Sequence, residues 1–258
     1  MAIVIAVANQ KGGVGKTTTS VNLAASLGMM QRRVLLVDLD PQGNATMGSG
    51  ADKNELTASI YDLLVDGAAA ASVIRATSVG YDLIGANADL TGAEIELMPI
   101  DRRESRLREA LAEVHKNYDF IIIDCPPALG LLTINGLIAA ESVLIPVQCE
   151  YYALEGLTAL LATIERISAT HNPSLRVEGM VRTMSDPRNS LSLDVSQQLL
   201  EHFGDTVYRT VVPRNVRLAE APSHVLPALL YDKHSRGTKA YLALAGEVLK
   251  KHPEKSKT

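Results

Sequence analysis

Short apolar segments recur along the chain, and longer segments with mixed apolar and polar positions separate them. The apolar segments are rich in β-branched residues and nearly free of polar ones: Ile3–Ala8, Val34–Val37, Phe120–Ile123, Val143–Val147 and Val177–Val181. Strands covered by helices on both faces have this composition, whereas half-exposed strands alternate apolar and polar residues. We therefore expect these segments to be buried strands.

The intervening segments have the apolar spacing or the length of helices. Apolar residues recur every three or four positions in Thr17–Met30, Arg103–Lys116, Leu131–Ala140 and Leu154–Thr170, and two later helices are expected at Leu191–Phe203 and Lys239–Lys250. Alternating strands and helices are typical of a doubly wound, mainly parallel sheet with helices on both faces. We predict this α/β fold.

The chain length and its breaks favour one domain. A chain of 258 residues suits a single α/β domain. The weak breaks at Gly48–Gly50, Gly67 and Asn172–Pro173 are too short to be linkers. We predict one domain over residues 1–252 and a flexible, basic C-terminal tail over residues 253–258.

Composition indicates what kind of core the protein has and in which cell compartment it works. Hydrophobic residues make up 47% of the chain, with two Phe and no Trp, so we expect an aliphatic core. Cys125 and Cys149 lack the spacing of a zinc site or a disulfide framework, so we expect reduced, buried thiols. The apolar start has no basic segment before it, and no apolar run reaches the roughly 20 residues of a membrane span. We expect a soluble, cytoplasmic protein.

Charge is distributed unevenly. The net charge is −4, so any nucleic-acid binding must come from a local patch. No lysine occurs between Lys116 and Lys233, whereas the segment from Lys233 to the end carries seven Lys and Arg against two acids. The basic tail lysines either contact DNA or are simply solvated: Lys250, Lys251, Lys255 and Lys257.

A glycine-rich loop follows the first predicted strand. Positions 9–18 read NQKGGVGKTT, and a predicted helix comes next. Glycines let backbone N–H groups point inward at the positive end of that helix, which is how a P-loop holds phosphates. Lys16 is placed to reach the β- and γ-phosphates, and the Thr17 hydroxyl to bind Mg²⁺. We predict an ATP site formed by Lys11, Gly12, Gly13, Val14, Gly15, Lys16, Thr17 and Thr18.

The loop departs from the generic P-loop pattern at two positions. Gln10 stands where that pattern has glycine, and Lys11 precedes the glycine pair. The loop resembles the deviant Walker A motif of the ParA/MinD group of P-loop ATPases. This resemblance implies that Lys11 reaches across a homodimer interface to the phosphates of the other subunit, whereas a lone Lys11 would be a solvated loop lysine.

Carboxylates follow two of the predicted strands. Asp124 resembles a Walker B aspartate, which implies that it holds Mg²⁺ through water. The sequence from Asp38 to Asn44, DLDPQGN, resembles the switch I segment of the family. That resemblance implies that Asp40 orients the attacking water and that Asp38 supports the Mg²⁺ shell. An aspartate after a strand can otherwise cap a helix or shape a turn.

The resemblance extends along nearly the whole chain. Positions 126–130, PPALG, resemble switch II, and positions 145–156 and 212–224 resemble chromosomal ParA of the Soj subgroup. In that family a Pro-Arg-Asn turn covers the adenine, which implies this role for Pro213 and Asn215; a strand-ending turn is the simpler alternative. The chain has Val225 where the subgroup usually has glycine, and a positive φ there would strain a β-branched residue.

The resemblance also implies DNA binding. ParA dimers bind duplex DNA without sequence preference, and Arg188, Arg214 and Arg217 are the candidates here. The alternative is that Arg188 is an ordinary loop arginine and Arg214 pairs with a neighbouring acid. Residues 117–232 carry seven Arg against thirteen Asp and Glu, so composition alone does not favour a basic face there.

We therefore expect a weak, Mg²⁺-dependent ATPase that acts in DNA partition and that a ParB-like partner stimulates. A MinD-like membrane ATPase is the alternative, but it needs an amphipathic C-terminal helix, and Tyr241–Leu249 is expected to be a core helix. An iron–sulfur reductase would need cluster cysteines from two subunits, and neither Cys125 nor Cys149 fits this role easily. A metabolic kinase would need a separate site for its acceptor substrate, and none is visible in the sequence. Whether the cargo is a chromosome or a plasmid stays open.

Overall fold

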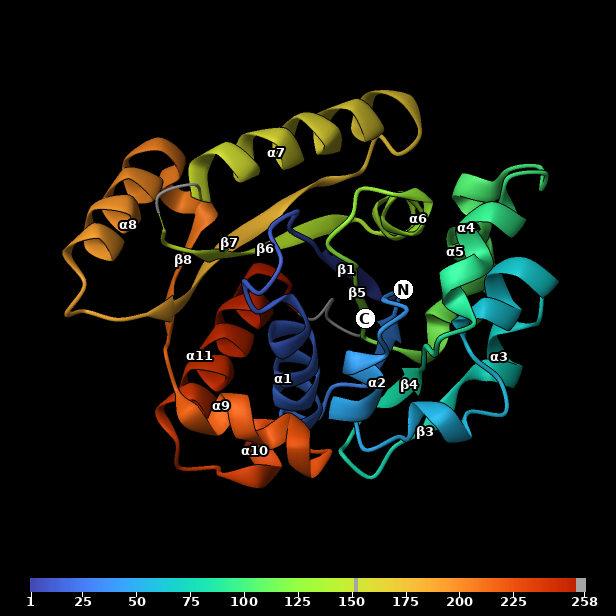
Figure 1. Cartoon of the computed structure of the whole chain (residues 1–258), viewed down its shortest axis with the longest axis horizontal. Coiled ribbons are helices and arrows are strands. Elements are labelled where there is room, and N and C mark those ends of the chain that lie inside the picture. The colour runs from blue at the N-terminus through green and yellow to red at the C-terminus, as the bar shows by residue number, and fades with distance from the viewer. Residues whose placement is uncertain (151–152, 254–258) are drawn as a thin grey trace.

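A computed structural model describes residues 1–150 and 153–253 and contains a twisted, mainly parallel sheet between two layers of helices (Figure 1). The strand order is β3-β4-β2-β5-β1-β6-β7-β8, and only the short β3–β4 pair among the described strands is antiparallel. The strands are β1 (Ile3–Val7), β2 (Val34–Asp38), β3 (Arg75–Ala76), β4 (Asp82–Ile84), β5 (Phe120–Asp124), β6 (Ser142–Gln148), β7 (Arg176–Ser185) and β8 (Val207–Pro213).

Helices connect the strands. The α-helices are α1 (Lys16–Met29), α2 (Asn44–Gly48), α3 (Ala70–Val73), α4 (Leu90–Leu97), α5 (Arg106–Val114), α6 (Leu131–Ala139), α7 (Ala153–Thr170), α8 (Ser190–Phe203), α9 (Val216–Glu220), α10 (Ala228–Tyr231) and α11 (Arg236–Lys251). A π-helical turn covers Asp62–Asp66, and short 3₁₀ turns cover Lys53–Glu55, Arg103–Ser105, His115–Asn117, Gly204–Thr206 and Ala221–His224.

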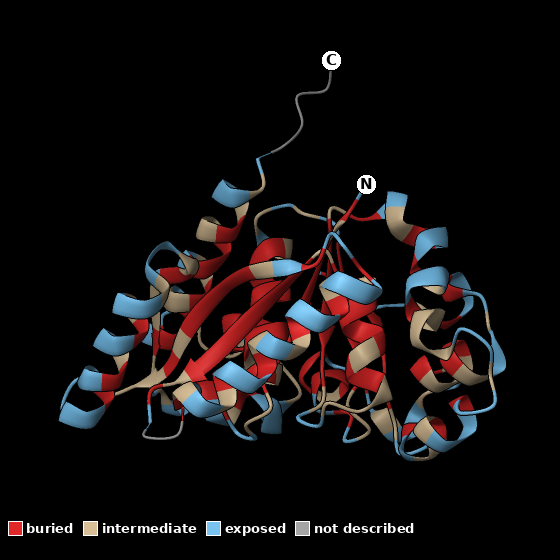
Figure 2. Ribbon diagram, turned by 90° about the horizontal axis from the view of Figure 1, so that it is seen from above, coloured by how far each residue is buried: buried red, intermediate tan, exposed pale blue. Residues whose placement is uncertain are grey.

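The core has two halves, one on each face of the sheet. Alternate residues of β1 point to opposite faces, so Val4 and Ala6 pack with α6 and α7, whereas Ile5 and Val7 pack with α1 and α11. Figure 2 shows the strands buried and the exposed residues on the outer sides of the helices. This covering on both faces explains why the central strands read as continuous apolar runs.

The predicted α/β fold is confirmed, and the five predicted strands correspond to β1, β2, β5, β6 and β7. The segment expected as one helix over Arg103–Lys116 is instead α5 flanked by two 3₁₀ turns. β8 was not predicted because it is an edge strand with exposed and half-buried positions, which breaks the apolar run. The tail from residue 254 onward lies outside the described residues, so the single-domain boundary stays a prediction.

The fold gathers the predicted phosphate loop and carboxylates at one edge of the sheet. In the sheet register Val7 pairs with Asp124, and Asp124 pairs with Asp38, so the ends of β1, β5 and β2 lie next to one another. Parallel strands put their carboxyl ends at the same edge, and ligands of doubly wound sheets bind outside that edge. Three segments far apart in sequence therefore converge on one place.

The last helix is part of the core. Tyr241, Leu244, Ala245 and Val248 of α11 are buried against α1 and the sheet, and the Tyr241 hydroxyl lies 3.1 Å from the hydroxyl of Thr19. The prediction of a core helix at Tyr241–Leu249 is confirmed. Among the described residues, no helix is both long and apolar enough to cross a membrane.

Val225 occupies the left-handed region, the conformation in which the sequence analysis expects a β-branched residue to be strained. Its φ is 59° and its ψ is 35°, directly after the 3₁₀ turn Ala221–His224. A β-branched residue is disfavoured there because its Cβ substituents crowd the backbone, whereas glycine adopts this conformation freely. The local backbone is therefore strained at the position where the subgroup usually has glycine.

We expect Val225→Gly to raise the free energy of unfolding by about 0.5–1.5 kcal/mol, since relief of left-handed strain exceeds the added backbone entropy of glycine. Chemical denaturation monitored by circular dichroism measures this change. Val225→Ile is the matched control and should give no gain, because isoleucine keeps the branched Cβ. A Val225→Gly protein less stable than the original would show that side-chain packing outweighs the strain.

Candidate nucleotide site

The loop between β1 and α1 has the backbone of a phosphate cradle. Gly13 and Gly15 have φ of 74° and 88°, the left-handed region that glycine adopts readily. Gly15 precedes α1, and no side chain of the described residues caps that end of the helix. Apart from the adjacent residues, a Cβ at Gly12 or Gly13 would meet no atom of the described residues within 4 Å. The loop is therefore open on the side where its N–H groups and the helix dipole favour an anion.

Lys16 is buried at the base of this loop. Lys16 is only 7% exposed as a residue. Its Nζ donates to the carbonyl oxygen of Lys11 over 3.1 Å. Burial lowers the pKa of Lys16, while the nearby charges of Asp124 and Asp40 oppose that shift. The ammonium is thus held under the open loop by weaker contacts than a phosphate would offer.

Asp124 lies at the end of β5 with its carboxylate directed at α1. Thr17 and Ser20 donate their hydroxyl hydrogens to its two oxygens, over 2.8 Å and 2.7 Å. Burial raises the pKa of Asp124, and these hydrogen bonds only partly offset the rise. A fully buried carboxylate beside a threonine hydroxyl is the oxygen donor set that Mg²⁺ prefers.

Asp38 and Asp40 face different neighbours. The oxygens of Asp38 accept hydrogen bonds from the backbone N–H of Asp40 and from both the N–H and the hydroxyl of Thr46. Burial, and then the charge of Asp124, raise the pKa of Asp38. Asp40 is half-buried, and its charge acts on both Lys16 and Asp124. Asp38 therefore braces the loop that presents Asp40.

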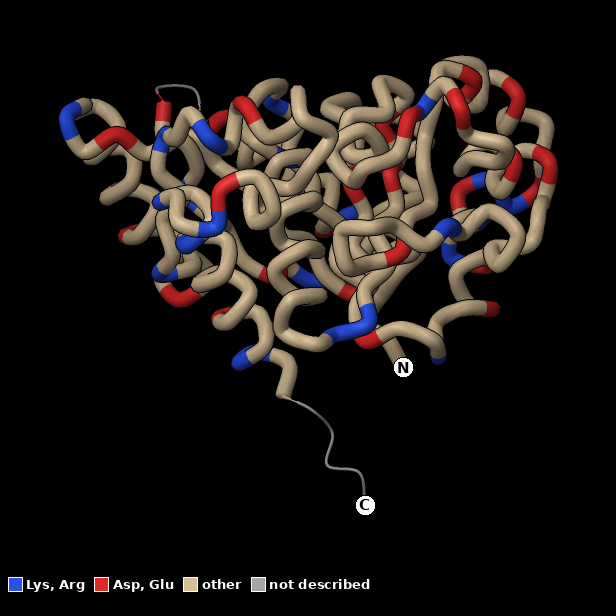
Figure 3. Tube along the Cα trace, turned by 90° about the horizontal axis from the view of Figure 1, so that it is seen from below, with Lys and Arg blue, Asp and Glu red and all other residues tan. Residues whose placement is uncertain are grey.

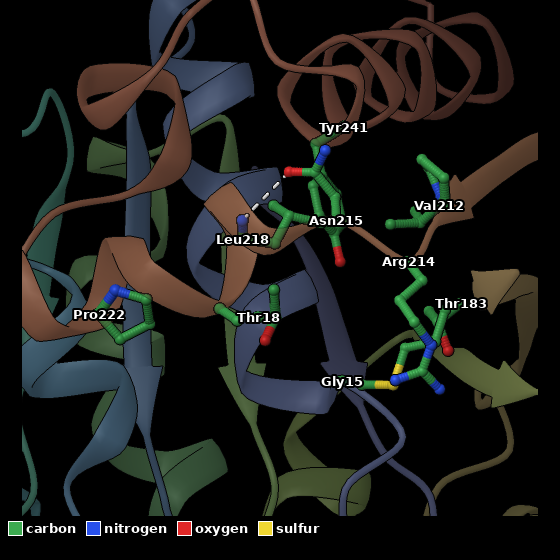
Figure 4. Close-up of a pocket in the computed structure, with 12 residues that line it drawn as sticks. Gly15, Thr18, Thr183, Val212, Arg214, Asn215, Leu218, Pro222 and Tyr241 are labelled. Carbon is green, nitrogen blue, oxygen red and sulfur yellow. Dashed lines mark hydrogen bonds between the residues drawn. The ribbon is translucent and has the colours of Figure 1, made fainter. Parts of the chain in front are cut away.

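A cavity of about 310 Å³ adjoins the loop (Figure 4). Its walls come from the phosphate loop, the end of β7, the end of β8 and α9: Gly15, Thr18, Thr183, Met184, Val212, Pro213, Arg214, Asn215, Leu218, Ala219, Pro222 and Tyr241. Asn215 uses its oxygen to cap α9 at Leu218, which leaves its amide N–H₂ directed elsewhere. Both residues predicted to contact the base, Pro213 and Asn215, line this largely apolar cavity.

Arg214 lies in the nucleotide pocket. In Figure 4 its side chain points from the end of β8 towards Gly15. The hydroxyl of Thr183 donates to the carbonyl of Val14 over 2.8 Å, so β7 is fastened to the phosphate loop beneath this side chain. Arg214 thus faces the loop, a placement that the sequence alone did not indicate.

Lys11 lies at the outer rim of the loop. Its ammonium forms an ion pair with Glu150 at 2.7 Å, and its side chain is 34% exposed. Within one chain, the ammonium of this lysine is therefore held by Glu150, just after β6. It does not share the burial of Lys16.

The two remaining arginine candidates lie on the surface near the end of the sheet. Arg188 pairs with Asp186 at 2.7 Å and Arg217 pairs with Glu220 at 2.9 Å, and their side chains are 87% and 51% exposed. Hydrogen bonds from Arg188, together with the charge of Arg214, lower the pKa of Asp186. Each surface arginine therefore has an acidic neighbour within the chain.

Two further cations lie near this surface. Arg236 and Lys239, in the first turns of α11, line a groove with Ser185, Pro187, Val211 and Pro213. Residues 176–253 carry eleven Lys and Arg against eight acids, whereas residues 52–116 carry seven against twelve. Figure 3 shows the resulting charge difference between the two sides of the molecule. The groove depends on the packing of α11 against β8, so sequence spacing alone did not identify it.

These residues fit a nucleoside triphosphate with Mg²⁺. The open glycine loop and the buried Lys16 suit the phosphates, Thr17 and Asp124 suit the cation, and the apolar cavity suits a base. All of them lie at the carboxyl edge of the sheet.

Sequence comparison finds relatives along the whole chain. The model of a family described as AAA domain matches residues 2–177. The sporulation initiation inhibitor protein Soj of Bacillus subtilis is 57% identical, over 96% of this chain and 98% of that protein. The chromosome partitioning protein ParA of Myxococcus xanthus is 50% identical, over 98% of this chain and 90% of that protein.

Structure comparison finds the same architecture. Cobyrinic acid a,c-diamide synthase of Mycobacterium smegmatis, solved with an ATP analogue and magnesium, has a TM-score of 0.85 and 38% identity, covering 97% of this chain and 95% of that chain. Its bound molecules match the kind of ligand that the geometry here suits. From the family match and the near full-length relatives, the chain belongs to the AAA-domain family and, within it, to the Soj/ParA group of partition ATPases.

Proposed function

We propose that the chain is an ATP-dependent DNA-partitioning protein. ATP binding drives a sandwich homodimer, the dimer binds duplex DNA without sequence preference, and slow hydrolysis, stimulated by a ParB-like partner, releases it. The observation that carries this proposal is the pair of lysines on one phosphate loop, one buried beneath it and one at its exposed rim. The named Soj and ParA relatives support the same function.

Within one chain, the phosphate loop and Lys16 bind the triphosphate. The N–H groups before α1 and the Lys16 ammonium offer charge-assisted hydrogen bonds to phosphate oxygens, stronger than the contact to the Lys11 carbonyl that they replace. Pro213 and Asn215 hold the base, and Arg214 is directed at the phosphate loop, so we assign it to the nucleotide rather than to DNA.

Hydrolysis needs an oriented water and stabilised phosphate charge. Asp40 stands at the rim of the site, close enough to Lys16 and Asp124 to influence both, which suits it to orient water. Thr17 and Asp124 would hold Mg²⁺, and the bound ion would neutralise charge on the phosphates. Asp38 keeps the Asp40 loop in place through Thr46 and also belongs to the surroundings of the cation.

A second subunit would meet the exposed face of the loop. Gly12 and Gly13 are exposed, and Lys11 is at the rim, so a partner pressed against this face receives the Lys11 ammonium next to its own phosphates. Such a contact exists only when a triphosphate supplies negative charge. This explains why nucleotide would control dimerisation.

DNA binding is assigned to the basic side of the molecule. Arg188, Arg217, Arg236 and Lys239 lie around the ends of β7 and β8 and the start of α11, and doubling them by dimerisation multiplies the phosphate contacts. With DNA binding at this surface, the proposed location of the working protein is the nucleoid, in the cytoplasm. The MinD-like alternative is less well supported. It needs a C-terminal helix whose apolar face binds a membrane, and the apolar face of α11 is buried in the core.

Lys16→Ala should lower ATP affinity about 100-fold or more, since it removes the buried ammonium under the loop. Titration with a fluorescent ATP analogue measures this, with melting temperature as the check on folding. Lys11→Ala is the matched control and should keep ATP affinity within about threefold, because within one chain the Lys11 ammonium is paired with Glu150. Retained affinity in Lys16→Ala would refute the P-loop assignment.

Asp40→Ala should slow single-turnover hydrolysis by about 100-fold or more, with ATP binding and dimerisation kept. Rapid-quench assays and size-exclusion chromatography with ATP measure the two properties. Asp38→Asn should differ from Asp40→Ala in one respect: it should also lower thermal stability. The reason is that the buried Asp38 carboxylate accepts three hydrogen bonds. Unchanged turnover in Asp40→Ala would assign the water to another group.

Arg217→Ala should weaken DNA binding of the ATP-bound protein and reduce the slope of log affinity against log salt by about 2, one phosphate contact per subunit. Fluorescence anisotropy across a salt series measures both quantities. Arg33→Ala is the control, since Arg33 is also an exposed arginine paired with an aspartate but lies at the opposite edge of the sheet. An equal loss in both variants would exclude a dedicated surface at Arg217.

A further inference from the structure

Glu150 holds the ammonium of Lys11 within a single chain. The Lys11 Nζ lies 2.7 Å from one oxygen of Glu150, and the side-chain amide of Gln148 donates to the other oxygen. The backbone also fixes this glutamate, because its N–H donates to the Gln148 carbonyl and its carbonyl accepts from Ala153, both over 2.9 Å. The carboxylate is therefore presented to Lys11 by a shaped turn after β6.

The phosphate loop is fastened to the same strand on its other side. The amide of Asn9 donates to the carbonyl of Pro146 over 2.8 Å, and the oxygen of Asn9 accepts from the N–H of Lys11 over 3.0 Å. The backbone of Lys11 is thus linked to β6 through Asn9, and its side chain is linked to Glu150, just after β6. The carbonyl of Lys11 accepts from Lys16, so the two lysines of the loop are linked.

We propose that Glu150 is a positioning residue that tethers Lys11 in cis in the monomer and must release it before Lys11 reaches the phosphates of a second subunit. The inference rests on the proposed function of Lys11 in the dimer. Because the same ammonium cannot stay on Glu150 and also cross the interface, the tether opposes dimerisation. It sets the protein concentration at which ATP produces the dimer.

The expected effect is modest for each tether and larger for the pair. Lys11 and Glu150 have side chains 34% and 48% exposed, so water screens the ion pair. Exposed pairs of this kind shift an equilibrium by about 1.5- to fivefold. A symmetric dimer releases two tethers, so the shift in the dimerisation constant is about two- to 25-fold.

The test compares Glu150→Gln with Glu155→Gln. Both variants remove one negative charge at neighbouring positions, but Glu155 is an exposed residue in the first turn of α7. In sedimentation velocity with a non-hydrolysable ATP analogue, Glu150→Gln should dimerise at about two- to 25-fold lower concentration. Glu155→Gln should match the original protein. An unchanged or weaker Glu150→Gln dimer would overturn the inference.

A double-mutant cycle separates the tether from general charge relief. In a Lys11→Ala background, Glu150→Gln should no longer strengthen the dimer, because the ammonium that the tether holds is absent. If Glu150→Gln strengthens the Lys11→Ala dimer equally, the gain comes from removing interface charge, and the inference is wrong.

A measurement on the monomer keeps the inference distinct from the proposed dimer. Without nucleotide, the labelling rate of Lys11 by an amine-reactive ester, followed by peptide mass spectrometry, should rise in Glu150→Gln and stay constant in Glu155→Gln. If no variant dimerises with ATP but this rate rises, the proposed function fails and the tether stands. An unchanged labelling rate refutes the tether whatever the dimer does.

Discussion

The site depends on one buried positive charge, the Lys16 ammonium, held under a glycine loop and beside buried carboxylates. Desolvation disfavours this charge, and Asp124 and Asp40 compensate for it only in part. Phosphate oxygens would offer the Lys16 ammonium charge-assisted hydrogen bonds that offset this desolvation.

Hydrogen bonds connect the loops around the site to neighbouring strands and helices. Asp38 connects the end of β2 to Thr46, whose hydroxyl accepts from Ala86 after β4, so the loop bearing Asp40 is tied to the sheet edge. On the other side, Glu94 of α4 accepts from the N–H of Leu132 at the start of α6, next to the segment resembling switch II. These contacts anchor each loop at one place. We therefore expect that a loop that moves when phosphate binds would move about its anchor.

The two lysines divide the work of recognition. In the proposed function the buried Lys16 binds the nucleotide of its own chain. Lys11 lies at the rim of the loop and pairs with Glu150 within one chain. A charge that is satisfied within one chain must be released before it serves another. The proposed dimerisation thus depends on competition between a carboxylate in cis and a triphosphate in trans, and competition of this kind is sensitive to small changes in either partner.

The sequence by itself determined the central strands, α1, the phosphate loop and the positions of Asp38, Asp40 and Asp124. These follow from local patterns, since double-sided burial produces apolar runs and a P-loop needs its glycines and lysine in consecutive positions. Only the tertiary structure decided that Arg214 faces the nucleotide pocket, that Arg236 and Lys239 line a groove with β8, and that Glu150 meets Lys11. Those contacts join residues far apart along the chain, and the direction of a side chain across such a distance depends on packing that no local pattern encodes.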